Sequence, residues 1–243
     1  MRLVAIVQAR MGSTRLPGKV LAAIEGKPML ERVVERARRV ARFEEVVVAT
    51  TVLPQDEPIV GLCRRIGVPV FRGSENDVLD RYCRASQTFA ADAVVRITSD
   101  CPLIDPGESS RVVDAFLEQA PDFAANDLVL SYPDGLATEV MTAAALETAW
   151  REAKQPYERQ HVAPYIYQHP DRFRLVNVAA PADYSHLRWT VDTQQDLNFV
   201  RAIYAHLGGG GMFDWRQVVD LLASEPALLA LNSGIRRKAL EEC

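Results

Sequence analysis

Long apolar runs are missing from this sequence. No stretch of about 18 uninterrupted apolar residues occurs, so no segment predicts a transmembrane helix. The first apolar stretch is short and ends at Arg10, which argues against a secretory signal peptide. A positive overall charge is missing too: the formal net charge of −4 argues against general binding to nucleic acid or to an anionic membrane. We expect a cytoplasmic protein that has no membrane or nucleic-acid partner.

Cysteine is scarce as well. The four cysteines contain no Cys-x-x-Cys pair and have no histidine at ligand spacing, which argues against a structural zinc site. We expect free thiols in a reducing compartment for all of them, namely Cys63, Cys83, Cys101 and Cys243.

What the sequence does contain is typical of one large α/β domain. It has 243 residues, of which 48% are hydrophobic and 25% charged, enough to bury a sizeable core. Strands and helices alternate through about residue 127, which predicts a doubly wound, mainly parallel sheet. In this half we expect strands at 3–7, 45–50, 68–71 and 93–98, with helices near 30–41, 57–66, 74–90 and from 106 onward.

The alternation changes from about residue 131. A strand at 138–141, mostly helical residues at 142–168 and strands at 174–178 and 187–191 are expected there, the last of them in the main sheet. The chain is therefore read as a single domain, 1–243, with a small inserted α+β subdomain at about 131–186. Gly208–Gly211 should link a helix that Thr193 caps to a final helix near 215–222.

A basic, glycine-containing loop follows the first strand at once. Gly12 and Gly18 allow backbone N–H groups to turn toward a ligand. Three cations could neutralise phosphate oxygens, and two hydroxyl groups could donate hydrogen bonds. The loop could simply be solvated, but α/β sheets bind ligands at the carboxyl ends of their strands. We interpret it as a triphosphate cradle made by Ala9, Arg10, Gly12, Ser13, Thr14, Arg15 and Lys19.

Two aspartates at predicted strand ends could hold a metal ion. Asp100 follows the strand at 93–98, and Asp192 follows the one at 187–191. Mg²⁺ needs only one or two protein carboxylates when triphosphate oxygens supply its other ligands. Each aspartate could instead cap a turn or helix, but with the upstream loop the pair favours a metal site.

Three of these segments carry a family resemblance. Residues 7–21, which read Val-Gln-Ala-Arg-Met-Gly-Ser-Thr-Arg-Leu-Pro-Gly-Lys-Val-Leu, closely resemble the signature of the cytidylyltransferase family. That family includes CMP-sugar-acid synthetases and the spore coat polysaccharide protein F branch. Residues 96–103 and 190–197 look like its Asp-x-Pro-Leu and Asp-Thr-x-Glu-Asp-Leu segments, with Gln195 in place of the usual Glu. The resemblance implies a Rossmann-like, GT-A-like nucleotidyltransferase fold and Mg²⁺ on Asp100 and Asp192.

Weaker similarity extends the implied site. Residues 73–82 resemble the family segment near the nucleotide base, which implies nucleotide contacts for Ser74, Asp77 and Arg81. Residues 132–140 and 157–165 resemble acceptor-side segments, which implies substrate contacts for Glu139, Arg159 and His161. Ala137 stands where a polar residue is common in relatives. An ordinary helix cap is nearly as good an interpretation of Asp77 and Asp80, and a structural role is an equally good interpretation of His161.

Together with these patterns, the resemblance implies transfer of CMP from CTP to a sugar-acid hydroxyl, with Arg10, Lys19, Asp100 and Asp192 as catalytic residues. The resemblance also implies a homodimer. Two other enzyme classes remain open: a sugar-1-phosphate nucleotidyltransferase and a sugar-nucleotide-dependent glycosyltransferase, although the latter normally carries an Asp-x-Asp pair, which is missing here. A catalytically silent nucleotide-binding partner in polysaccharide assembly is the non-enzymatic alternative.

Overall fold

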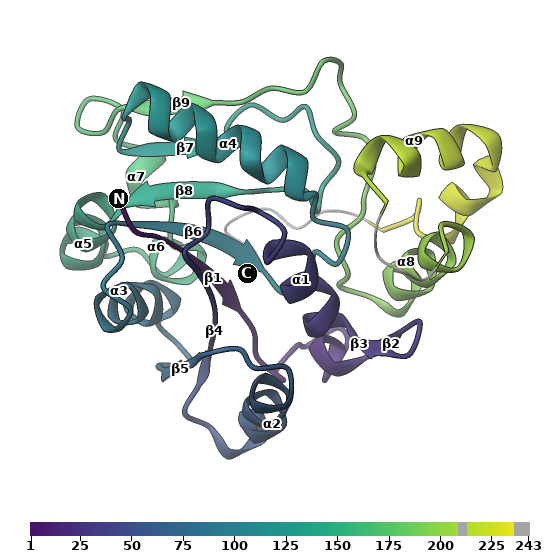
Figure 1. Ribbon diagram of the computed structural model, residues 1–243, viewed down its shortest axis with the longest axis horizontal. Helices are drawn as coiled ribbons and strands as arrows, with labels where there is room; N and C mark the ends of the chain where they lie inside the picture. The colour runs from purple at the N-terminus through teal and green to yellow at the C-terminus, as the bar shows by residue number, and fades with distance from the viewer. Residues whose placement is uncertain (209–212, 236–243) are drawn as a thin grey trace.

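The computed structural model describes residues 1–208 and 213–235. Cys243 and residues 209–211 of the expected glycine link lie outside these ranges. The centre of the molecule is a seven-stranded sheet in the order β5-β4-β1-β6-β8-β7-β9 (Figure 1). Its strands are β1 Leu3–Gln8, β4 Glu45–Thr51, β5 Val70–Gly73, β6 Ala93–Thr98, β7 Phe123–Ala125, β8 Glu139–Thr142 and β9 Leu175–Asn177.

The sheet is mainly parallel, as predicted. Four neighbouring pairs run parallel, whereas β8 is antiparallel to both of its neighbours. Both faces of β1 are buried, because Leu3, Ala5 and Val7 pack into one hydrophobic cluster and Val4 and Ile6 into another. This burial explains why β1 is a continuous apolar run without polar alternation.

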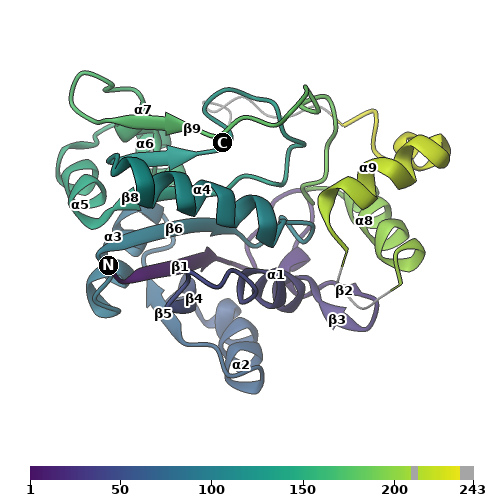
Figure 2. The same cartoon turned by 45° about the horizontal axis from the view of Figure 1, so that its top comes forward.

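Helices cover both faces of the sheet (Figures 1 and 2). The first cluster contains residues of α1 Met29–Ala37, α2 Glu57–Arg65 and α4 Pro106–Gln119. The second contains residues of α3 Val78–Thr88, α5 Ala143–Glu152 and α7 Pro164–Tyr167, next to the short α6 Pro156–His161. The predicted helices of the first half are therefore present, with ends that shift by up to a few residues. Within the described ranges, no helix is both long and apolar enough to cross a membrane.

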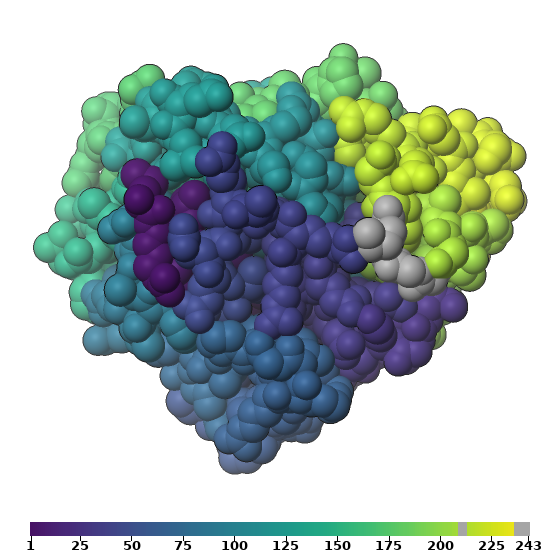
Figure 3. Space-filling view, viewed as in Figure 1, coloured from purple at the N-terminus to yellow at the C-terminus, as the bar shows by residue number. Residues whose placement is uncertain are grey.

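A third apolar cluster lies beside the sheet, on the side toward which β1 and β6 point (Figures 1 and 2). Trp189 and Trp215 are its largest buried side chains. Figure 3 shows residues 213–235, which we call the C-terminal lobe, in yellow at one side of the molecule. The cluster joins the hairpin β2 Ala23–Ile24 and β3 Lys27–Pro28 to α8 Gln194–His206, α9 Trp215–Ser224 and the 3-10 helix η3 Pro226–Leu231. Two further 3-10 turns are η1 Lys19–Leu21 and η2 Pro54–Asp56.

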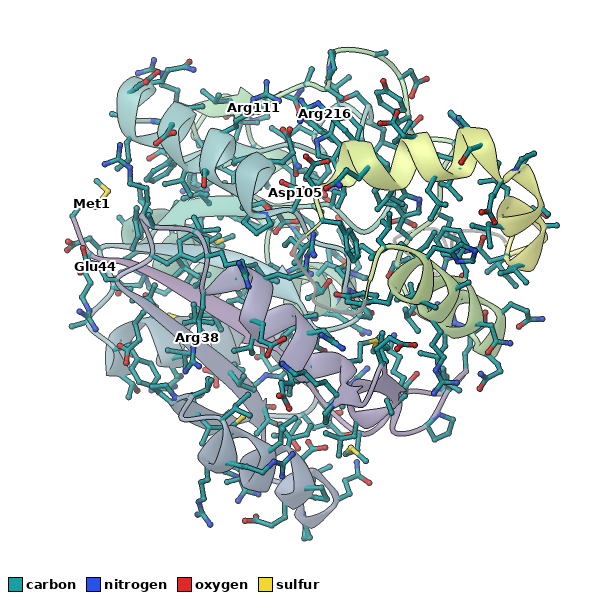
Figure 4. All side chains as sticks on the ribbon, turned by 45° about the vertical axis from the view of Figure 1, so that its right-hand side comes forward. Met1, Arg38, Glu44, Asp105, Arg111 and Arg216 are labelled. Carbon is teal, nitrogen blue, oxygen red and sulfur yellow. The ribbon has the colours of Figure 1, made fainter. Side chains whose placement is uncertain are left out.

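Two buried acids at the start of α4 connect this lobe to the helix layer on the sheet. Asp105 caps α4 by accepting from the N–H groups of Gly107 and Glu108, and its second oxygen accepts from the N–H of Trp215 at 2.8 Å. Glu108, which is 3% exposed, accepts from the Trp215 indole at 2.8 Å. In Figure 4, Arg111 and Arg216 point toward the same region above Asp105, and both guanidinium groups contact Glu108.

One predicted strand is wrong. Residues 187–191 do not join the main sheet, and only an isolated bridge links Arg188 to Asp134. Trp189 is fully buried in the third cluster, so the apolar pattern of this segment comes from packing against the C-terminal helices and not from strand pairing. Two other differences are smaller: the third strand is β5 at 70–73, and the short β7 and the β2–β3 hairpin were not expected.

Candidate active site

The principal cavity opens at the carboxyl ends of β1 and β6. Strand order reverses at this pair, since β4 and β5 lie on one side of β1 and β6 on the other, and doubly wound sheets bind ligands at such a point. The cavity has a volume of about 320 Å³. It is lined by Gln8, Ala9, Arg10, Gly12, Ser13, Thr14, Arg15, Lys19, Val20, Val78, Arg81, Thr98, Ser99, Asp100, Gln160, His161 and Asp192.

The loop after β1 is closed by its own backbone. The carbonyl of Met11 accepts from the N–H groups of Ser13 at 2.9 Å and Gly18 at 3.0 Å. Gly18 has φ +71°, a conformation that a residue without Cβ adopts at little cost. The buried Asp56 holds the other side of the loop, because its carboxylate accepts from the Met11 N–H at 2.7 Å. These contacts fix the loop at the mouth of the cavity.

Lys19 brings the two predicted metal aspartates together. Its Nζ lies 2.9 Å from Asp100 Oδ2 and 2.9 Å from Asp192 Oδ1, and it also donates to the Val191 carbonyl at 2.8 Å. The side chain is only 10% exposed. Folding therefore places a cation from the first motif between acids that lie more than 80 and 170 residues farther along the chain.

The charges of this cluster shift each other's protonation. Burial disfavours the ionised form of Asp192, but the Coulombic attraction of Lys19 and the hydrogen bonds from Lys19 and Arg188 outweigh it and lower the pKa to about 2. Burial likewise opposes ionisation of Asp100, and the charge of Lys19 again prevails and lowers its pKa. For Lys19, burial is outweighed by the two carboxylates, which raise its pKa. All three groups are ionised at neutral pH.

Arg188 is a member of the site that sequence reasoning missed. Its guanidinium group contacts Asp192 at 2.8 Å, Asp196 at 2.9 Å and Asp134 at 3.2 Å. Arg15 approaches the same oxygen of Asp192 at 2.9 Å. The prediction of a strand at 187–191 did not indicate this role, because a residue in the middle of a buried strand is not expected to contact three carboxylates.

A tight backbone approach sets the position of Arg188. Gly135 has φ +119°, and a Cβ built on it would lie 2.8 Å from the backbone of Trp189 and Thr190. Only glycine allows the turn at 132–135 to lie this close. The contact brings Asp134 beside Arg188 and so joins the turn to the Asp192 segment.

Two arginines make a second cationic part of the wall. Arg81 is 1% exposed and donates to the Ser74 carbonyl at 2.7 Å, while its Nε is buried without a hydrogen-bond partner. Burial and the nearby charge of Arg10 lower the pKa of Arg81. The Arg10 side chain makes no hydrogen bond or ion pair within residues 1–208 and 213–235. Like charges that face an open cavity in this way favour an anionic ligand.

His161 reaches the cavity from α6. The next residue, Val162, has φ +74° and ψ −57°, and the Ala163 N–H donates to the His161 carbonyl at 2.9 Å. This is the strained form of the γ-turn, which a β-branched residue rarely adopts. It ends α6 with His161 and Gln160 on the cavity wall. Gln160 was not predicted, and its only sequence signal is its place beside His161.

Other expected site residues do not line this cavity. The Asp77 carboxylate caps α3 by accepting from the Asp80 N–H at 2.9 Å, and Ser74 Oγ accepts from the Asp77 N–H at 3.1 Å. Arg159 contacts Asp77 at 2.5 Å and the Trp150 carbonyl at 2.6 Å. The three side chains tie α6 and α5 to the start of α3, and none is among the residues that line this cavity. Their nucleotide and substrate contacts stay predictions.

Glu139 also lies away from the cavity wall. It is directly opposite Arg96 across β6 and β8, and the two side chains form an ion pair at 2.8 Å. Only 13% and 9% of the Arg96 and Glu139 side chains are exposed. The structure thus shows Glu139 in a buried cross-strand ion pair, and its substrate contact stays a prediction.

The carboxylates fit a hard divalent cation. Asp100 and Asp192 converge on the Lys19 ammonium at one side of the cavity, and carboxylate oxygens are the donors that Mg²⁺ prefers. In the part of the chain that the structure describes, no group of three or more His, Cys, Asp or Glu side chains could enclose an ion. A metal ion here would therefore need further ligands from a substrate, as a triphosphate provides.

Fold and cavity together define an α/β nucleotidyltransferase, in which a cationic loop and strand-end acids share the switch point of a doubly wound sheet. Within this class, a cytidylyltransferase family model matches residues 4–206, and the chain belongs to that family.

Individual relatives agree with the family. The spore coat polysaccharide biosynthesis protein SpsF of Bacillus subtilis is 32% identical over 228 residues, 91% of this chain and 94% of that protein. A 3-deoxy-manno-octulosonate cytidylyltransferase of Trichlorobacter lovleyi is 36% identical over 119 residues, 48% of this chain and 46% of that protein. A solved cytidylyltransferase structure from Leptospira borgpetersenii has 32% identity and a TM-score of 0.92, covering 98% of this chain and 100% of its own.

Proposed function

We propose that the protein transfers CMP from CTP to the hydroxyl group of a sugar acid, with release of pyrophosphate, in the biosynthesis of a surface polysaccharide or glycan. The observation that carries this proposal is the Lys19 ammonium 2.9 Å from both Asp100 and Asp192. It means that the cationic loop and both acids face a single cavity. The family assignment supports cytidine as the base.

The triphosphate of CTP occupies the loop side of the cavity. Gly12, Ser13 and Thr14 present backbone and hydroxyl donors there, and Arg10 and Arg15 supply charge. The cytidine lies toward Arg81, whose buried Nε has no other partner. Catalysis of this kind depends mainly on alignment and charge stabilisation, so a covalent nucleophile is not required.

Asp100 and Asp192 would hold Mg²⁺, which when bound offsets charge on the phosphate oxygens. Lys19 keeps the two carboxylates facing one another and then faces the departing pyrophosphate. Arg188 holds the outer oxygen of Asp192, so that its other oxygen points into the cavity. Each acid thus stays ionised and oriented before the nucleotide arrives.

The acceptor lies on the other side of the cavity, where His161 and Gln160 of the 131–186 segment are in the wall. Glu139 and Arg159 support this side from behind through their ion pairs. The related octulosonate enzyme supports a sugar acid as the acceptor class. We also propose that the enzyme is cytoplasmic and homodimeric. Light scattering of the purified protein tests the homodimer, and fractionation of cells tests the location.

Pyrophosphate release tests the function. The wild-type protein should release pyrophosphate from CTP and Mg²⁺ only when a sugar acid is added, and should prefer CTP to ATP, GTP and UTP. Lys19→Met and Asp192→Asn should each lower the rate by at least about 100-fold, because Lys19 supplies positive charge that stabilises the transition state and Asp192 would hold the divalent cation that does the same.

Lys27→Met is the matched control, since Lys27 pairs with Glu35 on the surface and lies outside the cavity. It should keep the wild-type rate. CTP binding without pyrophosphate release for any sugar acid or sugar phosphate would instead identify a silent nucleotide-binding partner. Equal rates for Lys19→Met, Asp192→Asn and the wild type would reject the site.

A further inference from the structure

We propose that Asn232 is a positioning residue for the metal-binding aspartate, so that the C-terminal segment after α9 completes the active site. This inference rests on the proposed function for its catalytic consequence, but not for its structural part. Asn232 lies beyond residues 4–206, the span that the family model matches. It belongs to neither the loop nor the strand ends that form the cavity.

The Asn232 carboxamide is buried against two groups behind the site. It is 6% exposed, and its Nδ2 donates to the Arg188 carbonyl at 2.9 Å and to Asp196 Oδ1 at 3.3 Å. One side chain from the end of the chain therefore holds both the arginine and the acid that flank Asp192. An apolar residue of the same size would make neither contact.

Asp196 passes this constraint to Asp192 through the backbone. The Asp196 side chain is fully buried, and its Oδ2 accepts from the N–H groups of Asp192 at 3.0 Å and Thr193 at 2.9 Å. Its other oxygen, Oδ1, accepts from Arg188 Nε at 2.9 Å and also from Asn232 Nδ2. Arg188 in turn donates to Asp192 Oδ2 at 2.8 Å. Asn232 thus acts on Asp192 by two routes, the backbone and the guanidinium group.

The segment that carries Asn232 is firmly attached. Leu228 and Leu229 of η3 pack against the third apolar cluster, next to α8. The preceding helix, α9, is held to α4 by the two hydrogen bonds that Trp215 donates to Asp105 and Glu108. The position of Asn232 is therefore set by packing and by buried hydrogen bonds before it contacts Arg188.

Partners that orient a metal ligand typically change metal affinity or activity by about 10–100-fold when they are removed. We expect Asn232→Leu, which fills the same space without a donor, to raise the Mg²⁺ concentration for half-maximal turnover by about 10-fold or more. The KM for CTP at saturating Mg²⁺ should stay near the wild-type value. In thermal-shift measurements, the part of the CTP-induced shift that needs Mg²⁺ should shrink.

Val218→Ala is the control for lost stability. Val218 is 1% exposed in the same apolar cluster and is not a partner of Arg188 or Asp196. It should lower the melting temperature and leave the Mg²⁺ requirement unchanged. Hydrogen exchange gives a readout that needs no nucleotide: in Asn232→Leu the amides of Asp192 and Thr193 should exchange about tenfold faster, and in Val218→Ala they should not.

The outcomes separate the two proposals. Wild-type protein that neither binds CTP nor releases pyrophosphate rejects the proposed function, and amide exchange then still decides whether Asn232 holds Asp196. An Asn232→Leu variant with wild-type exchange at residues 192 and 193 and a wild-type Mg²⁺ requirement overturns the inference. An equal effect of Val218→Ala on both measurements overturns it too, because loss of stability would then explain the result.

Discussion

At the scale of single residues, the site is organised by one cation that serves two acids. Lys19 replaces solvent as the partner of Asp100 and Asp192 in a half-buried setting, where an unpaired carboxylate would be costly. Arg15 and Arg188 saturate the remaining oxygen of Asp192. The stability of this cluster is therefore tied to the ionised state of its acids.

This linkage predicts a specific pH dependence. The pKa of Asp192 is about 2 in the folded protein against an ordinary value of 3.8, so the unfolded chain binds its proton more readily. Asp192 then contributes about 2 kcal/mol of stability at pH 6 and about 1 kcal/mol at pH 3, and nothing once the pH is well below 2. Urea unfolding of wild-type protein and Asp192→Asn should be measured at both pH values. The difference between their free energies of unfolding should be smaller at pH 3 than at pH 6.

Asp220→Asn provides the comparison for that series. Asp220 is an exposed residue of α9 and forms no ion pair in the part of the chain that the structure describes. Its substitution should change the free energy of unfolding by less than about 0.5 kcal/mol, because the side chain is on the surface and has no ionic partner to lose among the described residues. A constant gap between wild type and Asp192→Asn from pH 6 to pH 3 would contradict the assigned linkage.

At the scale of secondary-structure elements, β6 and β8 are joined by more than backbone hydrogen bonds. Arg96 and Glu139 form their ion pair where the antiparallel strand β8 meets the parallel part of the sheet. Burial opposes the charge of Arg96, but the attraction of Glu139 outweighs it and raises the pKa of the guanidinium group. Both charges are well desolvated, so either one alone would be left uncompensated.

A double-mutant cycle tests this structural reading of Glu139. Glu139→Leu alone should destabilise the protein by about 3–5 kcal/mol, because it leaves Arg96 buried without its partner. The double variant Arg96→Met, Glu139→Leu should cost much less than the sum of the single changes. Both are measured as free energies of unfolding in urea. A Glu139→Leu variant of wild-type stability that loses acceptor turnover would instead restore the substrate contact expected from the sequence.

At the scale of the whole molecule, the C-terminal lobe is joined to the sheet by a few buried polar groups. Asp105 is the clearest example, because one carboxylate caps α4 and also accepts from the first residue of α9. Through this joint the lobe is held where η3 and Asn232 meet the back of the site.

Replacing Asp105 should lower the free energy of unfolding more than replacing a residue that only caps a helix. Asp105→Ala loses the α4 cap and leaves the buried Trp215 N–H unpaired, which we expect to cost about 3 kcal/mol. Thr142→Ala removes only the single cap bond to Ala145 at the start of α5, and should cost about 1 kcal/mol. Urea unfolding of both variants measures the contrast. Equal losses would mean that Asp105 does not connect α4 to the lobe.

Much of the first half of the fold could be predicted from the sequence. The strand at 3–7 is a continuous apolar run with a glycine-containing loop after it, and Asp105 before Pro106 marks the start of α4, as the structure has it. The segment at 187–191 could not be predicted, since apolar residues packed against helices produce the same pattern as a buried strand. Burial by itself does not reveal which element supplies the packing partner.

The local chemistry can be taken from the sequence: a cationic loop after β1, aspartates at 100 and 192, and an α/β alternation that brings strand ends to one edge. Which of these charges meet depends on the folded chain. In the folded chain Lys19 lies between the two acids, and Arg188 contacts Asp192. Asn232 donates to Asp196. Glu139 pairs with Arg96, and Arg159 pairs with Asp77. The physical reason is that an ion pair depends on distance in space, whereas a sequence pattern constrains only near neighbours along the chain.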